Sequence, residues 1–465
     1  MRWILLILSI LFLMSNQVLW ASEEPIHFGR FGQVAVYRGS LYPSQVVLFV
    51  SGDGGWNKGV IDMAKALVSL DAVVAGIDIT HYMKELSVSS EKCNYPAADF
   101  ESLSKFIQKK LDFPNYVSPI LVGYSSGATL VYATLVQAPP NTFRGAISLG
   151  FCPDLPLTKP LCQGSGLEWK PGPRGRGYSF LPASSLQTPW IAFQGTIDQV
   201  CNAGDVENYV RHVREGEIVL LPKVGHGFAV QRNWMPQFRQ AFKNLVERYE
   251  INRSSFVNEL KDLPLIEVLP KDQSKDFMAV ILSGDGGWAG IDRDLGNEMV
   301  RQGVPVVGLN SLQYFWRRRT PDEAAKDLER ILRHYLASWN KEKTILIGYS
   351  LGADVLPFMV NRLPRELLRQ VQGVVLLGPS DVVDFEFHLT DWVGVSSEKK
   401  GYSVLPEVEK LKGVRVLCFY GEDESHSLCK KLDVGLGKII SLKGGHHFGG
   451  DYEAIAETIL GDVKQ

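Results

Sequence analysis

The chain alternates short apolar runs with longer stretches in which apolar residues recur every three or four positions. Four of the short runs, at 46–50, 120–122, 146–149 and 190–193, are bounded by turn residues. Such runs are typical of buried strands, whereas the stretches between them are typical of helices with one apolar face. Strands that alternate with helices predict α/β domains, in which helices cover both faces of a mostly parallel sheet.

One helix start is marked by its first residues. Thr320 stands at the capping position, Pro321 at the first helical position and Glu323 at the third, before the periodic segment 324–336. A threonine and a glutamate at this spacing can form reciprocal hydrogen bonds with the unpaired N–H groups at a helix start. We therefore expect a helix that begins at Pro321.

The whole pattern occurs twice. The nonapeptide LFVSGDGGW at 48–56 is matched by VILSGDGGW at 280–288. Later pairs follow in the same order: VGYSSGA with IGYSLGA, GYSFLP with GYSVLP, and VGHGF with GGHHF. The offset between the copies is 232 residues at the acidic residue of the nonapeptide, 225 at the serine and 220 at the histidine, as small loop deletions would produce. The sequence predicts two tandem α/β domains at 22–251 and 277–465, joined by a linker and lead-in strand at 252–276.

Length and composition agree with this organisation. The 465 residues exceed what one hydrophobic core usually organises. With 22% charged residues, 45% hydrophobic residues and a formal net charge of −2, the chain resembles neither a disordered protein nor a polyanion-binding one. Nucleic acid is not an expected partner. The histidines outside the motifs show no ligand spacing, so neither a metal site nor a cofactor is predicted.

The N-terminus has the order of a secretory signal. Arg2 precedes an apolar run at 3–14, and small residues follow at Ala21. Because the run is too short to span a bilayer comfortably, residues 1–21 are predicted to be a signal peptide, with an uncleaved anchor as the alternative. Both interpretations place the rest of the chain outside the cytoplasm.

The cysteine content is compatible with export. An even number in an exported chain permits disulfides but does not fix their pairing. Cys418 lies in an apolar run, where a buried free thiol is equally consistent. No connectivity is predicted for the six residues, Cys93, Cys152, Cys162, Cys201, Cys418 and Cys429.

Each copy contains a G-x-S-x-G turn directly after an apolar run and before a helical stretch. In that setting the glycines allow a sharp turn that raises the serine hydroxyl above the sheet, near the positive end of the helix. Ser125 and Ser350 are therefore the predicted nucleophiles. A serine hydroxyl is a poor nucleophile at neutral pH, so each needs a base and an acid that orients the base.

Acid and base candidates follow each serine in the order expected of an α/β-hydrolase. In the first copy they are Asp198 and His226. In the second copy the base is His446, which aligns with His226. The second acid stays open. Glu424 matches Asp198 by distance from the preceding glycine, whereas Asp423 matches it by residue type.

The repeated SGDGGW loop also has a predicted role. In α/β-hydrolases the loop after an early strand supplies one N–H group to the oxyanion hole, and the residue after the nucleophile supplies the other. Asp53 and Asp285 are the first predicted donors, through their main chain, and Ser126 and Leu351 are the second. A carboxylate is awkward beside an anionic intermediate. The side chains of Asp53 and Asp285 therefore either stabilise the local turn or helix start, or pair with a cationic group of the substrate.

Together these motifs resemble the bacterial virulence-protein VirJ and AcvB family, within the α/β-hydrolase superfamily. The second copy carries SGDGGW, YFW with RTPDEAAKDL, IGYSLGADVLP, GYSVLP and GGHHFGGDY, and it resembles the single-domain VirJ form. The first carries a looser copy, so the whole chain resembles the tandem AcvB arrangement. The resemblance implies two tandem α/β-hydrolase domains in a periplasmic serine hydrolase. Its substrate would be the aminoacyl ester of lysyl-phosphatidylglycerol, or of a related aminoacylated phosphatidylglycerol, at the membrane surface. The substrate ammonium would suit Asp285 or Asp53.

Two other functions stay open. One is a general carboxylesterase or thioesterase with no lipid preference. The other is a periplasmic interaction module that supports an envelope secretion system and virulence, with the fold as a scaffold. A nucleophile and a base in both copies favour an enzyme, because a scaffold need not keep them together. The segment YFWRRR at 314–319 either docks an anionic lipid surface or packs its aromatic residues under a cap, and we favour the second.

Overall fold

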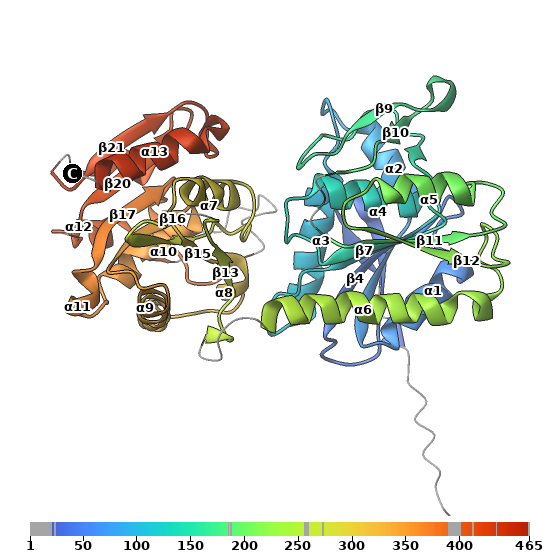
Figure 1. Ribbon diagram of the computed structural model, residues 1–465, viewed down its shortest axis with the longest axis horizontal. Coiled ribbons are helices and arrows are strands. Elements are labelled where there is room, and N and C mark those ends of the chain that lie inside the picture. The colour runs from blue at the N-terminus through green and yellow to red at the C-terminus, as the bar shows by residue number, and fades with distance from the viewer. Residues whose placement is uncertain are drawn as a thin grey trace, which may run out of the picture.

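The computed structural model describes residues 21–463, except 23–24, 185, 187, 255–259, 272–273, 389–400, 412 and 434. The predicted signal peptide therefore lies outside the described residues, apart from Ala21. Figure 1 shows two α/β domains that follow one another along the chain, each with a central sheet between helices. The predicted fold class, a mostly parallel sheet flanked by helices in each of two tandem units, is confirmed. Within the described part, no helix is both long and apolar enough to cross a membrane.

The N-terminal domain is built on a nine-stranded sheet. Its strands lie in the order β1 (Ala21–Ser22), β3 (Gly32–Arg38), β5 (Ala72–Ile77), β4 (Gln45–Val50), β6 (Ile120–Tyr124), β7 (Gly145–Leu149), β11 (Trp190–Gly195) and β12 (Gly216–Leu221), and β2 (Ile26–Phe28) pairs with β3. The pairs from β5 through β12 are parallel, and β3 is antiparallel to β5. The four apolar runs predicted as strands lie in β4, β6, β7 and β11.

Helices cover both faces of this sheet. One core contains residues of α1 (Lys58–Val68) and α6 (Met235–Ser254). The other contains residues of α2 (Ile79–Val88), α3 (Pro96–Lys110), α4 (Ser126–Gln137) and α5 (Ala203–Arg211). A small antiparallel sheet stands beyond the carboxyl ends of the main strands, in the order β8 (Asp154–Leu155), β10 (Tyr178–Phe180) and β9 (Trp169–Pro171). The 3-10 turns are η1 (Gly29–Phe31), η2 (Pro173–Gly175) and η3 (Gln231–Asn233).

The C-terminal domain repeats the design with a seven-stranded sheet. The order is β13 (Leu265–Val268), β15 (Val306–Leu309), β14 (Phe277–Leu282), β16 (Lys343–Tyr349), β17 (Val371–Leu377), β20 (Val416–Gly421) and β21 (Lys438–Leu442). Only β13 is antiparallel to its neighbour in this sheet. A separate two-stranded ribbon pairs β18 (Val382–Val383) with β19 (Tyr402–Ser403).

The helices of this domain are again divided between two faces. Residues of α7 (Ile291–Arg301) and α13 (Tyr452–Val463) share one core, and residues of α9 (Pro321–Ser338) and α10 (Leu351–Val360) share the other. As predicted, α9 begins at Pro321. The Thr320 hydroxyl accepts the Glu323 N–H at 3.2 Å, and the Glu323 carboxylate accepts the Thr320 N–H at 2.8 Å. Shorter elements are α8 (Ser311–Tyr314), α11 (Arg365–Leu368), α12 (Leu405–Glu409), η6 (Leu428–Lys431) and η7 (Phe448–Gly450).

All six cysteines are paired. Because Cys418 bonds to Cys429, the alternative of a buried free thiol at Cys418 is wrong. The three disulfides are Cys93–Cys162, Cys152–Cys201 and Cys418–Cys429.

The aromatic residues of the YFWRRR segment are buried. Trp316 is 2% exposed and clusters with Tyr116 of the N-terminal domain and with Leu312 and Phe387 of its own. Its indole N–H donates to the Phe113 carbonyl at 2.9 Å. These rings are therefore covered by protein, and the interpretation that they dock a lipid surface is wrong.

Candidate active sites

Both serines of the G-x-S-x-G turns lie at a strand-to-helix junction. Ser125 follows β6 and precedes α4 with φ 54° and ψ −123°, and Ser350 follows β16 and precedes α10 with φ 51° and ψ −118°. A positive φ is uncommon for serine and marks a functional turn. The last glycine of each motif is required by close approach. A side chain at Gly127 would collide with the Ser51 carbonyl, and one at Gly352 with the Leu282 carbonyl.

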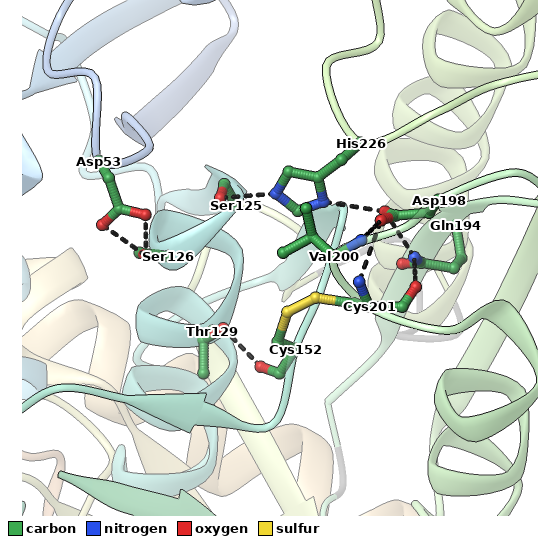
Figure 2. The surroundings of a disulfide bond; sticks show 10 residues. All are labelled: Asp53, Ser125, Ser126, Thr129, Cys152, Gln194, Asp198, Val200, Cys201 and His226. Atoms are coloured by element: carbon green, nitrogen blue, oxygen red, sulfur yellow. Dashed lines mark hydrogen bonds and ion pairs between the residues drawn. A yellow bond between two sulfur atoms is a disulfide. The ribbon is translucent and has the colours of Figure 1, made fainter. Parts of the chain in front are cut away.

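We call Ser125, His226 and Asp198 the first candidate site. The Ser125 Oγ lies 2.9 Å from His226 Nε2, and His226 Nδ1 lies 2.9 Å from Asp198 Oδ2. Figure 2 shows these side chains in one hydrogen-bonded series. In this geometry the imidazole can accept the serine proton while its other nitrogen stays oriented by the carboxylate. The structure thus brings together all three residues that the sequence predicted.

The carboxylate of Asp198 is fully buried and has further donors. Gln194 Nε2 donates to it at 2.9 Å, and the N–H groups of Val200 and Cys201 donate at 2.8 and 3.0 Å. Cys201 is also bonded to Cys152, which ties the loop after β11 to the loop after β7 (Figure 2). The disulfide therefore holds one of the backbone donors of the acid. Sequence analysis missed Gln194, whose place four residues before Asp198 was the available signal.

We call Ser350, His446 and Glu424 the second candidate site. His446 Nδ1 lies 2.6 Å from Glu424 Oε1, and the Gly421 N–H donates to Glu424 Oε2 at 2.6 Å. Within the described residues, no hydrogen bond joins the Ser350 hydroxyl to His446. The second site therefore has its base and acid in contact but its nucleophile separate.

The structure decides between the two acids that the sequence left open. Asp423 is exposed, and its N–H donates to the Gly444 carbonyl, so the Asp423 alternative is wrong. In both domains the residue that meets the histidine is the third after the last glycine of the strand, which is Asp198 after Gly195 and Glu424 after Gly421. Backbone path, rather than residue type, selects the acid.

A tyrosine supports the histidine loop in each domain. The Tyr124 hydroxyl donates to the His226 carbonyl at 3.0 Å, and the Tyr349 hydroxyl donates to the His446 carbonyl at 3.3 Å. Burial raises the pKa of both phenols, so each stays protonated and able to donate. Partial burial and the neighbouring His446 lower the pKa of His447, whose Nδ1 lies 3.2 Å from the Tyr349 hydroxyl. Sequence analysis missed these tyrosines, although each precedes a serine of the repeated motif.

The two SGDGGW loops lie beside the serines and are braced from the next strand. In the first loop the Ser51 hydroxyl accepts the Ile79 N–H at 3.1 Å. In the second the Ser283 hydroxyl accepts the Ser311 N–H at 2.9 Å. Each loop tryptophan fits over a glycine of the neighbouring strand, where any side chain would collide with the indole. The repeated motif therefore encodes a complete loop conformation.

The acidic residues of these loops have different surroundings. Asp53 is exposed, and its two carboxylate oxygens accept the Ser126 hydroxyl at 2.7 and 2.8 Å (Figure 2). It therefore binds the residue after the nucleophile rather than its own turn or helix. In the second loop Asp285 is half-buried, and the residue after the nucleophile, Leu351, has no hydroxyl to offer.

A second buried carboxyl supports the second loop. Asp292 is 2% exposed and its Oδ2 accepts the Gly284 N–H at 3.3 Å. Burial, with a smaller contribution from Asp285, raises the pKa of Asp292 well above its usual range. Sequence analysis missed Asp292, because nothing in the order of residues showed that the first turn of α7 faces inward there.

No metal-binding arrangement is present among the described residues, which contain no group of three or more His, Cys, Asp or Glu side chains placed to hold an ion.

The model of the family described as "Bacterial virulence protein (VirJ)" matches residues 44–148 and 276–465. No curated protein matches the chain by sequence.

Several solved structures resemble about half of the chain. Est1E from Butyrivibrio proteoclasticus is 10% identical and covers 48% of this chain and 100% of its own, with a TM-score of 0.34. An α/β serine hydrolase without a lid from Xanthomonas campestris is 20% identical and covers 50% of this chain and 94% of its own, with a TM-score of 0.31. A butyrate-bound esterase from Thermogutta terrifontis is 15% identical and covers 49% of this chain and 94% of its own, with a TM-score of 0.34.

Proposed function

The chain belongs to the VirJ family of bacterial virulence proteins, and on that premise we propose that it is a periplasmic serine hydrolase. The proposed substrate is the aminoacyl ester of lysyl-phosphatidylglycerol or of a related aminoacylated phosphatidylglycerol. The observation that carries the proposal is the hydrogen-bonded series Ser125, His226 and Asp198, with His446 and Glu424 paired in the second domain. Three disulfides support an oxidising compartment.

The proposed reaction is acyl transfer in two steps. The serine Oγ attacks the ester carbonyl while its proton passes to the histidine Nε2, and the N–H groups beside the serine stabilise the tetrahedral oxyanion. Collapse of the intermediate breaks the bond to the glycerol oxygen, which takes the proton from the histidine and leaves as phosphatidylglycerol. Water, activated by the same histidine, then attacks the acyl-enzyme and releases the free amino acid.

The charge of the second candidate site supports a cationic acyl group. Asp285 belongs to the loop beside Ser350, and Glu424 orients the base. Burial is the main cause that raises the pKa of Tyr349, and the negative charges of Asp285 and Glu424 contribute to the same shift. A lysyl ester brings an ammonium group into this anionic setting, whereas a fatty acyl ester brings none.

The deciding experiment compares the parent with Ser125→Ala, Ser350→Ala and the double variant. Lysine release from lysyl-phosphatidylglycerol vesicles and hydrolysis of a soluble neutral ester would be followed side by side. We expect the double variant to lose at least about 10³-fold in lysine release. Release at the parent rate would disprove the serine mechanism, and hydrolysis of the soluble ester alone would disprove the lipid substrate. A parent without any hydrolytic activity would favour the interaction module.

One observation favours a second activity for the first candidate site. Its loop carboxylate, Asp53, accepts the hydroxyl of Ser126 with both oxygens and is already engaged. A substrate ammonium would have to compete with that hydroxyl. We therefore propose general carboxylesterase activity at Ser125 as the alternative for this domain, and the Ser350→Ala variant tests it with neutral esters.

A further inference from the structure

The two domains meet head to tail. The N-terminal domain contributes the edge at which its central strands begin. Tyr116 and Ser118 precede β6, Asn141 and Thr142 precede β7, and Glu101 lies on α3. Figure 1 shows α3 on the side of this domain that faces the other one. The first candidate site, at the opposite ends of the same strands, is therefore outside the contact.

The C-terminal domain contributes its catalytic edge to the same contact. Gly286 of the second SGDGGW loop and Ala289 just after it follow β14. Leu312 and Trp316 follow β15, and Glu386 follows β18. Lys109 of α3 fixes the contact, because its ammonium donates to the Trp316 carbonyl at 2.7 Å and lies 3.7 Å from Glu386. The first domain thus forms a wall beside the second candidate site.

An open cleft of about 530 Å³ lies between this wall and the second loop. On the C-terminal side it is lined by Trp288, the last residue of the loop, and by Arg293 and Asn297 of α7. On the N-terminal side Asn141 supplies an amide, while Leu135 and Pro140 supply an apolar surface. Asp294 lines the cleft as well, so the cleft offers a guanidinium paired with a carboxylate, two amides and an apolar wall.

The guanidinium has donors to spare. Arg293 uses Nε and one Nη2 hydrogen towards the same oxygen of Asp294, at 2.7 and 2.6 Å. A guanidinium carries five N–H groups in a fixed fork that matches phosphate oxygens. The Arg293 side chain is 26% exposed, so a ligand in the cleft can reach it.

We propose that this interdomain cleft binds the phosphodiester of the substrate whose ester reacts at Ser350. Arg293 would hold the phosphate, and Asn297 and Asn141 would bind the glycerol hydroxyls. The assignment of the cleft to Ser350 rests on the proposed function.

The second loop connects the cleft to the serine. Gly284, at one end of the loop, lies against Ser350, and Trp288, at the other end, lines the cleft. Four residue steps span at most about 14 Å, so the cleft begins close to Ser350. In an aminoacylated phosphatidylglycerol a single glycerol unit separates the ester from the phosphate, so the substrate would place its phosphate at the end of the cleft nearest the serine. The N-terminal domain would then determine the specificity of a reaction carried out by the other domain.

Binding can be tested without catalysis. The full chain with Ser125→Ala and Ser350→Ala would be titrated calorimetrically with glycerophosphoglycerol, the deacylated head group, and with inorganic phosphate. Adding Arg293→Gln should weaken glycerophosphoglycerol binding about tenfold, because a charge-assisted bidentate contact is lost. Adding Asp294→Asn should tighten it, because a competing carboxylate is removed. The matched control is Arg333→Gln, another ion-paired arginine of this domain, which lies on α9 outside the cleft.

Two results would overturn the proposal. The first is equal affinity of the Arg293→Gln and Arg333→Gln variants for glycerophosphoglycerol. The second is equal binding of inorganic phosphate and glycerophosphoglycerol, which would assign a phosphate site instead of a head-group site. These outcomes do not depend on hydrolysis, so they are separate from failure of the proposed function.

A kinetic measurement then links the cleft to Ser350. In the Ser125→Ala background, Arg293→Gln should raise the KM for lysyl-phosphatidylglycerol about tenfold and leave the KM for lysine methyl ester unchanged, because the methyl ester has no phosphate. Equal changes for both substrates would show that Arg293 only supports the fold of the second loop.

Discussion

The two candidate sites differ in which of their side chains are hydrogen-bonded to one another and in how exposed those side chains are. In the first, the serine, histidine and buried carboxylate are joined, and the loop carboxylate Asp53 is exposed. In the second, the serine stands apart from His446, whose side chain is 39% exposed against 18% for His226, and Asp285 is half-buried. The two copies therefore share a serine, a histidine and an acidic residue, but the surroundings of these residues differ. We expect substrate choice, more than mechanism, to separate the two.

The largest effect on kcat should come from replacing the carboxylates that orient the two histidines. Asp198→Asn in the Ser350→Ala background and Glu424→Gln in the Ser125→Ala background should each lower kcat about 10⁴-fold, because the histidine loses its orienting carboxylate. Asp423→Asn is the matched control and should change kcat less than twofold. Steady-state kinetics on a lysyl ester and a neutral ester would measure this. A loss at Asp423 as large as at Glu424 would contradict the assignment of the second acid.

The disulfides should give the next effect. The Cys152–Cys201 bond closes 49 residues and Cys418–Cys429 closes 11, so replacing each pair by alanine should cost about 4 and about 3 kcal/mol of unfolding free energy. Only the first should also slow hydrolysis at Ser125, because Cys201 donates to Asp198. Denaturant unfolding and kinetics would separate the two effects. Replacing Cys93–Cys162 is the control, and an equal loss of Ser125 activity there would make the effect one of general stability.

The loop carboxylates should give a smaller and more selective effect. Asp285→Asn should lower kcat/KM for a lysyl ester about tenfold relative to a neutral ester, because the substrate ammonium loses its counter-charge. Asp53→Asn should change this ratio less, because Asp53 is exposed and solvent screens its charge, whereas Asp285 is half-buried. The ratio would be measured in single-site backgrounds. Equal losses on both esters would make Asp285 a structural residue.

The smallest effect concerns pH. The pKa of buried Asp292 is raised above the value of about 3.9 expected in the unfolded chain. At a pH between the unfolded-state pKa and the folded-state pKa of Asp292, the folded chain keeps a proton that the unfolded chain has lost. The free energy of unfolding therefore falls as pH rises through this range. Asp292→Asn lacks this titration, so its Tm relative to the parent should increase from pH 5 to pH 8. The exposed Glu457→Gln is the control, and parallel Tm profiles for parent and Asp292→Asn would exclude this role.

The features that local patterns encode were predictable. The apolar runs became β4, β6, β7 and β11, and the capping box appeared at Thr320. Strand, turn and helix follow one another within a few residues at each serine, so the G-x-S-x-G turns could be placed from the sequence. Chain order then sufficed to select Asp198 and His226, because strands of a parallel sheet all end at one edge.

Features that depend on contacts between distant residues could not be predicted. The bond from Ser126 to Asp53 joins residues 73 apart, and the bond from Trp316 to Phe113 joins residues 203 apart. No periodicity records such pairs. The choice between Glu424 and Asp423 stayed open in the sequence for a related reason, since it depends on which way one loop residue faces. Disulfide pairing likewise needed the path of the whole chain.

The head-to-tail contact makes the order of the two halves matter. The contact between the halves joins Lys109 and Phe113 of the first half to Trp316 of the second. A gene with the halves exchanged would encode the same two folds, yet Trp316 would no longer follow the surface that covers it. The two halves therefore depend on their order in the chain as well as on their separate folds.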